Sequence, residues 1–413
     1  MKKITVVGGG LAGWLSALYV QRCGFAEEVT LIESSEIGIL GAGEGSVPAF
    51  REMLVGLLGV NEKAFIKRTN STKKVAINFE NWSGTGSMYD HDFIGMFKDY
   101  FQNLSESKFD HTDVYAYHFD ARLIADFLKE LALERGIKLI DGEVIDFQLS
   151  VNNDIKGLIL KDNTVVETDF VFDCSGFKRL IIGKLHETEW ISYEDQLKVN
   201  TAVPFFLPRT DNEEFTKTDA ITMKCGWMWK IPLKDRWGCG YVFDKNYTTE
   251  EEAKKEVIEF LGHDVSFNKT LNFNSGCYKD TWVGNCIAIG LSSGFMEPLE
   301  ATSILVTVQQ LHTIYRHVSH IGFENYYQAI GSYNEFVRNI NEQVMLFVRY
   351  HYICGRQDTP FWIDYKNLDI PKKLQKYIDS DLSDLDILLH HTQKFPMFAN
   401  WSWQLVKKGN FDL

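Results

Sequence analysis

Positive charge is scarce in this chain of 413 residues. Its 43 Lys and Arg are outnumbered by 56 Asp and Glu, which gives a formal net charge of −13. Because nucleic acid presents a dense array of negative phosphates, this balance argues against a nucleic-acid partner. The longest apolar runs fall far short of the roughly 20 residues that a membrane span needs, and no basic amphipathic helix predicts binding to an anionic membrane. We therefore expect neither partner.

The chain also lacks closely spaced cysteine pairs and has few prolines. The seven cysteines are odd in number and contain no C-x-x-C pair, which argues against a zinc or other metal site and favours a reducing, cytoplasmic compartment. The start, MKKITVVGGG, resembles an export signal in its two lysines, but three glycines interrupt the apolar run that follows. With 8 prolines, 45% hydrophobic residues and no biased tract, the composition predicts a globular protein with a sizeable core.

A β-α-β pattern opens the chain. We predict a strand at Ile4–Val7, a glycine turn, a helix at Ala12–Cys23 and a second strand at Val29–Ile32. Continuous apolar strands separated by a helix are typical of a parallel sheet that is covered on both faces. The sequence therefore predicts an α/β fold that begins with a Rossmann-like nucleotide-binding unit.

The glycine turn, GGGLAG, has the spacing G-x-G-x-x-G. In this pattern Gly8 permits a tight turn, Gly10 lets the backbone approach a pyrophosphate, and Gly13 lets the helix pack on the strand. Ala12 lies in the first helical turn, where N–H groups hold phosphates. Glu33 ends the second strand about 20 residues after Gly13, where a carboxylate binds ribose hydroxyls. A glycine turn without a ligand is the alternative, but its position between strand and helix favours a dinucleotide site.

A later apolar strand, Phe170–Cys174, follows several short β-runs and leads into Ser-Gly. An excursion that returns to the nucleotide sheet in this way resembles flavoproteins of the glutathione-reductase type. This resemblance favours FAD over NAD and implies that Asp173 and Gly176 lie beside the cofactor. Because no second G-x-G-x-x-G is present, we expect no separate NAD(P)H site, so the flavin must be reduced by another protein.

The rest of the chain contains some segments with the periodicity of a strand and others with the periodicity of a helix. We predict a strand at Val75–Phe79, a helix at Asp120–Arg135 and a tight turn at Asp162-Asn163. Residues 85–112 look irregular, and residues 197–290 look rich in strands. Residues 302–352 have the spacing of two long helices.

Several further stretches match the motifs of one family. They are GGGLAGW at 8–14, GEGSVP at 43–48, AYHFDARLIADFL at 116–128, WMWKIP at 227–232 and SSGFMEPLEATSI at 292–304. Together they resemble the flavin-dependent tryptophan halogenases, over nearly the whole chain. WMWKIP fits the pattern W-x-W-x-I-P, which separates halogenases from hydroxylating relatives.

The resemblance implies a two-component enzyme. FADH2 is supplied by a separate flavin reductase, and with O2 it converts a halide ion into hypohalous acid, which halogenates a small aromatic molecule such as an indole or a phenol. A homo-oligomer is compatible with this organisation. The sequence contains no internal repeat, low-complexity segment or flexible linker, so we expect four parts that interdigitate. These parts are 1–190, mainly FAD-binding; 191–285, mainly a β-rich substrate side; 286–355, the halide and flavin loop with long helices; and 356–413, a substrate-side tail.

Lys74 aligns with the family's catalytic lysine, whose ammonium positions hypohalous acid or whose amine forms a haloamine. Its neighbour Lys73 is the rival, although strand alternation sends the two side chains to opposite faces. Glu300 aligns with the family's essential glutamate, which orients the electrophile and accepts the ring proton. Glu297 is the rival of Glu300, but its spacing in the motif assigns it to the flavin side.

The resemblance assigns the other site residues. Thr302 and Ser303 open the first long helix, whose N-terminal N–H groups bind the halide. Trp227 and Trp229 shield the flavin from the substrate, and ordinary core tryptophans are the alternative interpretation. The remaining residues are Gly43, Glu44, Gly290 and Pro298 at the cofactor, and His91, Phe93 and Trp403 in the substrate pocket.

Two departures concern the substrate. The chain ends at Leu413, sooner than better-known tryptophan halogenases, and Ala301 replaces the serine that often follows the glutamate. We therefore expect a short member with a truncated tail and a more open pocket. Two alternative functions are a flavin-dependent aromatic monooxygenase and a degenerate, non-enzymatic flavin-binding protein.

Overall fold

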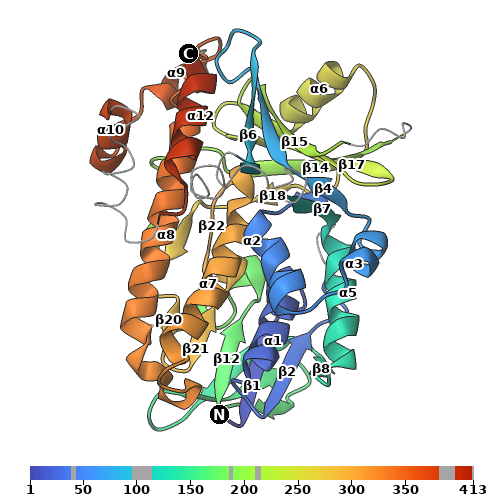
Figure 1. Cartoon of the computed structure of the whole chain (residues 1–413), viewed down its shortest axis with the longest axis vertical. Helices are drawn as coiled ribbons and strands as arrows, with labels where there is room; N and C mark the ends of the chain where they lie inside the picture. The colour runs from blue at the N-terminus through green and yellow to red at the C-terminus, as the bar shows by residue number, and fades with distance from the viewer. Residues whose placement is uncertain (39–42, 95–113, 186–188, 210–214, 381–395, 412–413) are drawn as a thin grey trace, which may run out of the picture.

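Two large sheets lie at opposite ends of the molecule, joined by long helices (Figure 1). The computed structural model describes residues 1–38, 43–94, 114–185, 189–209, 215–380 and 396–411. The helices α7 (Thr302–Val318) and α8 (Ile330–His351) run along the length of the molecule and confirm the two predicted long helices.

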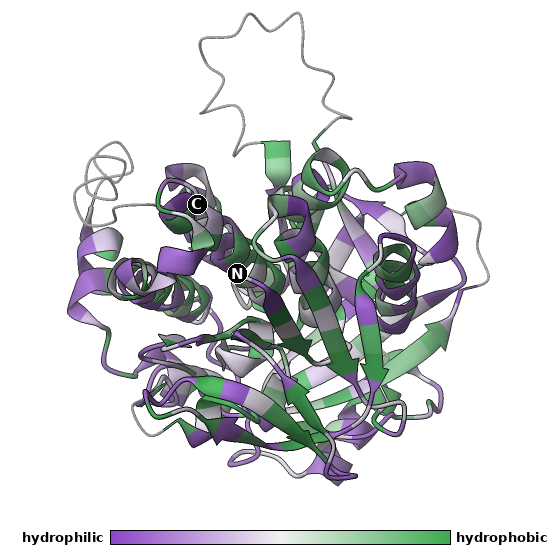
Figure 2. Ribbon diagram, turned by 90° about the horizontal axis from the view of Figure 1, so that it is seen from below, coloured by the Kyte–Doolittle hydropathy of each residue, from purple (hydrophilic) through white to green (hydrophobic). Residues whose placement is uncertain are grey.

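The first sheet has six strands in the order β20-β21-β12-β1-β2-β8. Neighbouring strands are parallel, except that β20 runs antiparallel to β21. Figure 2 shows hydrophobic residues along its central strands, as expected for strands buried on both faces. The predicted α/β fold is therefore confirmed. The strands are β1 (Lys3–Val7), β2 (Glu28–Glu33), β8 (Lys138–Asp141), β12 (Phe170–Asp173), β20 (Trp282–Val283) and β21 (Cys286–Ala288).

The predicted β-α-β unit is present, with α1 (Leu11–Cys23) between β1 and β2. The turn requires glycine at two positions. Gly8 has a φ of +116°, and a Cβ atom there would lie 2.2 Å from the carbonyl oxygen of Cys174. A Cβ atom on Gly13 would lie 1.8 Å from the carbonyl oxygen of Gly8. These two glycines therefore have the turn and packing roles that the motif predicts.

The second sheet has seven strands in the order β18-β14-β17-β16-β15-β5-β6. Along β16, Trp227 and Trp229 belong to the core cluster that includes residues of α8, whereas Met228 belongs to the cluster beneath α6 (Glu250–Leu261). This alternation is the period of two that a strand imposes. The strands are β5 (Ala76–Glu80), β6 (Met88–Asp92), β14 (Thr201–Pro208), β15 (Lys217–Met223), β16 (Gly226–Pro232), β17 (Arg236–Phe243) and β18 (Leu271–Asn272).

The prediction that residues 85–112 are irregular was wrong for residues 88–92, which form β6; residues 95–112 lie outside the described residues. The sequence of β6, MYDHD, has no hydrophobic alternation, because β6 is an edge strand whose partner β5 supplies its hydrogen bonds. Tertiary pairing, and not local hydrophobicity, makes this segment a strand.

The predicted helix after residue 120 is α5 (Ala121–Glu134), and the Asp120 carboxylate caps it by accepting hydrogen bonds from the backbone N–H groups of Arg122 and Leu123. The tight turn at Asp162-Asn163 is also confirmed, with Asn163 at a φ of +68°.

Three small sheets and several short helices complete the fold. The small sheets are β3 (Gly43–Gly45), β7 (Ala116–Asp120) and β4 (Thr72–Lys74); β9 (Val144–Leu149), β10 (Ile155–Leu160) and β11 (Val165–Glu167); and β13 (Trp190–Ser192), β19 (Gly276–Tyr278) and β22 (Gly294–Phe295). The remaining helices include α2 (Pro48–Arg51), α3 (Glu62–Arg68), α9 (Pro360–Lys366), α10 (Lys372–Asp379) and α12 (Asn400–Phe411).

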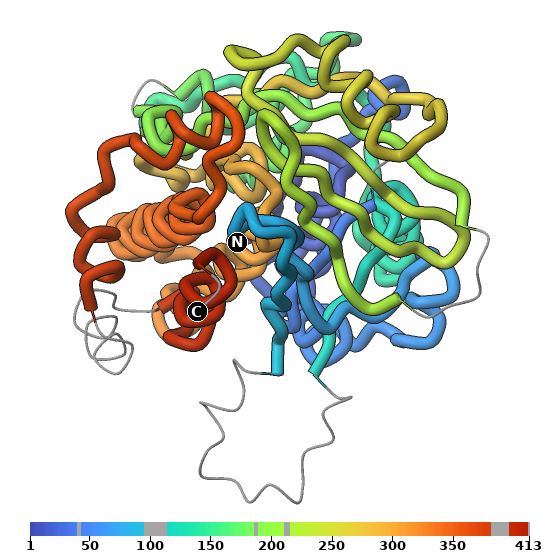
Figure 3. Tube along the Cα trace, turned by 90° about the horizontal axis from the view of Figure 1, so that it is seen from above, coloured from blue at the N-terminus to red at the C-terminus, as the bar shows by residue number. Residues whose placement is uncertain are grey.

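The C-terminal helix α12 packs against elements from earlier in the chain. It lies beside α8 and the edge strand β6 (Figure 3). Residues near positions 90, 350 and 400 are thereby brought together. None of the described helices combines the length and hydrophobicity needed to cross a membrane.

Candidate functional site

The N-terminus of α1 has the features of a phosphate site. Gly10 caps the helix without a side-chain hydrogen bond, and the first turn carries no acidic residue, so its N–H groups have no side-chain acceptor. A Cβ atom on Gly10 would meet no atom within 4 Å, and Ala12 lies in the adjacent first turn. The Glu33 carboxylate lies against the turn, because a Cβ atom on Gly9 would be 1.7 Å from its Oε2. Free N–H donors, open space and a nearby carboxylate fit a dinucleotide such as FAD.

Asp173 shapes the next loop through its own hydrogen bonds. Its fully buried carboxylate accepts hydrogen bonds from the backbone and hydroxyl of Ser175 and from the backbone N–H groups of Ile181 and Ile182. Gly176 follows, with a φ of +68° and open space where a Cβ atom would lie. Asp173 thus fixes the conformation of the loop that contains Gly176.

The other residues assigned to the cofactor come from two more segments. A Cβ atom on Gly290 would lie 2.9 Å from the Cβ of Ala12, so these two residues pack together. Gly43 and Glu44 lie on β3, and burial together with the charge of Asp120 raises the pKa of the Glu44 carboxyl to about 7. Pro298 is exposed just before the turn that carries Glu300.

Gly10→Trp is expected to abolish FAD binding without unfolding the protein. The new side chain enters open space, so it clashes with a bound pyrophosphate but not with the chain itself. Flavin fluorescence titration measures binding, and circular dichroism checks the fold. Gly331→Trp is the control, because Gly331 is an exposed glycine on α8 that also has open space around it. Unchanged FAD affinity in Gly10→Trp would show that the cofactor binds elsewhere.

Lys74 is a buried lysine at the end of β4. Its side chain is 1% exposed, and its Nζ donates a hydrogen bond of 3.1 Å to the carbonyl oxygen of Ser46. Burial lowers the pKa of the Lys74 amine to about 8, although the negative charge of Glu300 opposes this shift. Its neighbour Lys73 is exposed and lies over the Tyr115 ring at 4.3 Å. The two lysines therefore point in opposite directions, as strand alternation predicts.

Glu300 is held in an unusual backbone conformation. Glu300 and Ala301 have φ angles of +66° and +55°, and two consecutive non-glycine residues in the left-handed region cost about 1–3 kcal/mol each. The Glu300 carboxylate is buried, and its Oε1 lies 2.7 Å from Nδ1 of His91 and 3.0 Å from Nε2 of His351. Burial favours the neutral acid, but the charge and hydrogen bonds of these histidines outweigh it and hold the pKa of Glu300 far below its usual value.

The structure brings four predicted residues into one site. His91 contacts Glu300, and the ring of Phe93 lies 5.5 Å from Nζ of Lys74. The charges of Glu300 and Lys74 influence each other. The site thus contains a buried cation, a buried anion and an aromatic wall, contributed by β4, the end of β6 and the turn before α7.

The N-terminus of α7 lies beside this site. The helix begins at Thr302, with Ala301 as a cap that makes no side-chain hydrogen bond, and its first turn contains no acidic residue. Thr302 and Ser303 line a small cavity together with Gly290, Gly294 and Asn341. Unpaired N–H groups at a helix start that face a cavity can hold a small anion.

Trp227 is anchored by a hydrogen bond as well as by packing. Its Nε1 donates to Oε2 of Glu297 at 2.7 Å, and Oη of Tyr352 donates to the same oxygen at 2.6 Å. Burial raises the pKa of the Glu297 carboxyl to about 7, and these two hydrogen bonds only partly oppose the shift. Trp229 packs edge-on against Trp227, with ring centroids 6.2 Å apart. Glu297 therefore positions Trp227 and does not share the cluster of Glu300.

Trp227→Ala is expected to lower the free energy of unfolding by about 3–5 kcal/mol, the usual cost of truncating a buried Trp. Trp227 is 2% exposed, and its loss also removes a donor from the buried Glu297. Denaturant unfolding measures the change. Trp227→Phe, which retains most of the ring packing, should lose less. A loss below about 1 kcal/mol in Trp227→Ala would show that the surroundings do not depend on this side chain.

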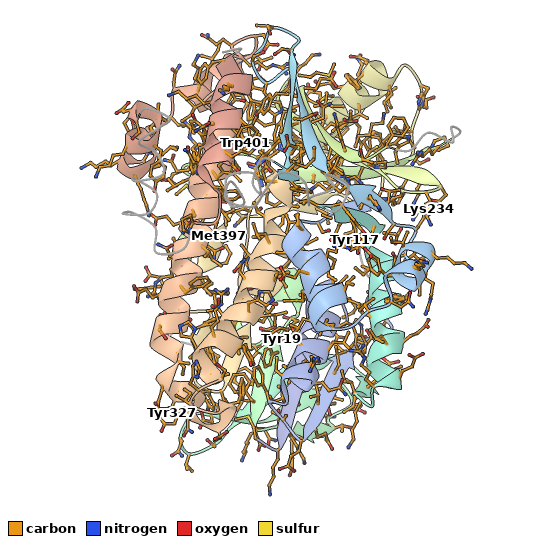
Figure 4. The ribbon with its side chains drawn as sticks, viewed as in Figure 1. Tyr19, Tyr117, Lys234, Tyr327, Met397 and Trp401 are labelled. Atoms are coloured by element: carbon orange, nitrogen blue, oxygen red, sulfur yellow. The ribbon has the colours of Figure 1, made fainter. Side chains whose placement is uncertain are left out.

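Trp403 and its neighbour Trp401 occupy different environments on α12. Trp403 is 2% exposed and packs against Phe347, Tyr350 and Tyr377 within the core. Trp401 is half-buried, and Figure 4 shows it in the half of the molecule opposite the N-terminus, where α12 lies. Of the predicted pocket residues, His91 and Phe93 thus meet the Lys74 and Glu300 cluster, whereas Trp403 packs in the neighbouring core.

Sequence analysis missed two side chains of the cluster. Nε2 of His91 lies 2.9 Å from Oγ of Ser402, and His351 contacts Glu300 from the end of α8. A histidine in an apolar helix is usually a core residue, and a serine in a helix carries no distinctive signal. Only their proximity to the Glu300 and His91 cluster in the folded protein identifies Ser402 and His351 as part of the site.

Comparison with known proteins places this geometry in context. The family model for tryptophan halogenase matches residues 3–112 and 101–410. The chain is 31% identical to tryptophan 7-halogenase RebH of Lentzea aerocolonigenes, over 91% of this chain and 81% of the relative. It is 30% identical to tryptophan 6-halogenase SttH of Streptomyces toxytricini, over 91% of this chain and 83% of the relative. The crystal structure of SttH superposes with a TM-score of 0.87, over 99% of this chain and 90% of that one.

Proposed function

Because this chain belongs to the tryptophan halogenase family, whose members are flavin-dependent enzymes, we propose that it is an FADH2-dependent halogenase acting on a small aromatic molecule. Lys74 and Glu300 are its catalytic residues. The substrate is indole- or phenol-like. The relatives named tryptophan 7-halogenase and tryptophan 6-halogenase favour an indole.

Bound FAD, once reduced by a separate flavin reductase, supplies with O2 the oxidising power that converts a halide into hypohalous acid. The N–H groups at the start of α7, with Thr302 and Ser303, would hold the halide. The first turn of α1 and the Glu33 carboxylate would hold the nucleotide.

Lys74 acts on the oxidant. Its ammonium can donate a hydrogen bond to hypohalous acid, or its free amine can form a haloamine; a pKa of about 8 makes both forms accessible near neutral pH. Halogenation transfers the halogen from oxygen or nitrogen to a ring carbon, and the ring then loses a proton. Glu300, which is held ionised, accepts that proton. Phe93 lies beside Lys74 and His91 lies beside Glu300, so both would meet a substrate bound at this pair.

The observation that carries this proposal is the burial of Lys74 and Glu300 within reach of each other's charge. A buried charge is costly unless it is paired, and such pairs with shifted pKa values gather at functional sites. A purely structural lysine would more commonly reach solvent, as Lys73 does.

The direct test supplies FADH2 from an unrelated reductase, adds chloride, bromide or iodide in turn, and screens indoles and phenols by mass spectrometry. A halide-dependent mass increase of one halogen minus one hydrogen is expected. A hydroxylated product formed without halide would establish the monooxygenase alternative. Flavin binding without any product would favour the non-enzymatic one.

A further inference from the structure

His351 lies between two hydrogen-bond acceptors. It is the last residue of α8 and is fully buried. Its Nδ1 lies 2.8 Å from the carbonyl oxygen of Phe347, and its Nε2 lies 3.0 Å from Oε1 of Glu300. Neither a carbonyl nor an ionised carboxylate can donate a hydrogen bond.

These contacts restrict which hydrogens the ring can carry. Nδ1 must carry a hydrogen, because the Phe347 carbonyl only accepts. In a neutral imidazole, Nε2 would then direct its lone pair at the Glu300 carboxylate across 3.0 Å. Two facing lone pairs in a buried site are strongly unfavourable. While Glu300 is ionised, Nε2 must therefore also carry a hydrogen, and His351 is an imidazolium.

His91 is not constrained in the same way. Its Nδ1 donates to Oε1 of Glu300, and its Nε2 meets Oγ of Ser402, which can donate or accept. A neutral His91 with its hydrogen on Nδ1 satisfies both partners. The contacts therefore require a second ring hydrogen on His351 opposite an ionised Glu300, whereas they permit either form of His91.

The two histidines contact only one oxygen of the Glu300 carboxylate, so its other oxygen can accept a proton. Both bind Oε1 of Glu300, whereas Oε2 has no hydrogen bond among the described residues. The groups facing this cluster are Lys74 from β4 and Tyr89 from β6, and the Tyr89 hydroxyl donates to Asn410. The ring of His351 itself packs against Phe79, Trp82 and Phe347, which keep water away from it.

We propose that His351 is a positioning residue of the site: as an imidazolium it fixes Oε1 of Glu300, keeps the carboxylate ionised and leaves Oε2 to receive the proton of the substrate ring. The protonation state of His351 is argued from contacts within this chain together with an ionised Glu300, whereas its catalytic consequence rests on the proposed function. The two parts are tested separately.

The first experiment measures protonation in the ligand-free protein. Nitrogen NMR of ¹⁵N-histidine-labelled protein reports the hydrogen on each ring nitrogen, and the loss of one set of signals in His351→Phe assigns them. Both nitrogens of His351 should be protonated at neutral pH. In Glu300→Gln the Nε2 hydrogen should be lost, because the glutamine amide can donate to the lone pair. A neutral His351 in the wild-type protein would overturn the proposal, whether or not the protein halogenates anything.

The second experiment measures the catalytic role by rescue. His351→Ala should lower kcat for halogenation on the order of 10²–10³-fold, the usual loss when one preorganised donor is removed. KM should change less than about threefold, because the His351 ring contacts Glu300, Phe347, Phe79 and Trp82 within the core. Added imidazole, which has the size and hydrogen-bonding groups of the removed ring, should restore kcat at least about tenfold. Loss of activity without rescue in a folded, FAD-binding variant would overturn the catalytic role.

His317→Ala is the matched control. Nδ1 of His317 lies 2.8 Å from the carbonyl oxygen of Thr313 on α7, so this histidine makes the same backbone hydrogen bond as His351. No hydrogen bond or ion pair to a carboxylate is found for it in the described part of the chain. The variant should keep wild-type kcat and show no response to imidazole. A loss as large as that of His351→Ala would show that the helix hydrogen bond alone explains the effect.

Discussion

Lys74→Ala is expected to abolish halogenation while the variant still oxidises FADH2. In the proposed function the oxidation takes place at the flavin and Lys74 positions the oxidant beside the substrate, so only the second step would need the side chain. The loss should be on the order of 10²–10⁴-fold, the range for removing electrostatic or general acid-base assistance. Product formation by mass spectrometry and FADH2 consumption by absorbance, measured on the same sample, separate the two steps.

Lys73→Ala is the matched control for this prediction. Lys73 precedes Lys74 on β4, but its side chain is exposed against Tyr115. Its removal should leave halogenation unchanged. If Lys73→Ala were inactive and Lys74→Ala halogenated normally, the assignment of the lysine would be wrong.

Lys74→Arg should also fail, for a steric reason that the structure provides. A Cβ atom on Gly45 would lie 3.1 Å from Nζ of Lys74, so the β3 backbone closes tightly around the ammonium. A guanidinium is larger and planar, and it is a poorer nucleophile than an amine. We therefore expect that a positive charge at position 74 is not sufficient for halogenation.

Glu300→Gln is expected to slow halogenation on the order of 10²–10⁴-fold but to leave some activity. The amide can still hydrogen-bond, yet it takes up a proton poorly, and it removes the negative charge that faces Lys74 and His351. Single-turnover halogenation at saturating substrate measures the chemical step.

Glu297→Gln is the control for Glu300→Gln. Its Oε2 accepts from Trp227 and Tyr352, so an amide oxygen can keep both hydrogen bonds. The variant should retain most of its halogenation. A requirement for Glu297 together with dispensable Glu300, at unchanged FAD affinity, would reverse the two assignments.

The sequence predicted the nucleotide end of the fold well because its signals are contiguous. The β-α-β unit, the glycine turn and the two long helices each depend on a periodicity within one segment. The strand β6 was not predicted, because its residues show no hydrophobic alternation and β5 supplies its hydrogen bonds.

Motif positions in the sequence identified Lys74, His91 and Glu300 as candidates, but spacing along the chain does not bring them together. Lys74 is buried because its strand alternation turns it inward, and Lys73 is exposed for the same reason. Trp403 was also predicted in the substrate pocket; it packs against Phe347 and Tyr350, and its contact with a substrate stays a prediction.

The sequence by itself determined the β-α-β unit with its glycine turn and the residue types of the candidate site, since both are encoded in short local patterns. Only the tertiary structure decided how the carboxylate of Glu300 is held. Its histidine contacts join residues 209 and 51 positions apart, and the contact of His91 with Ser402 spans 311 positions. Such contacts depend on how α8, α12 and β6 pack together, because packing, and not local propensity, sets which side chains share a buried space.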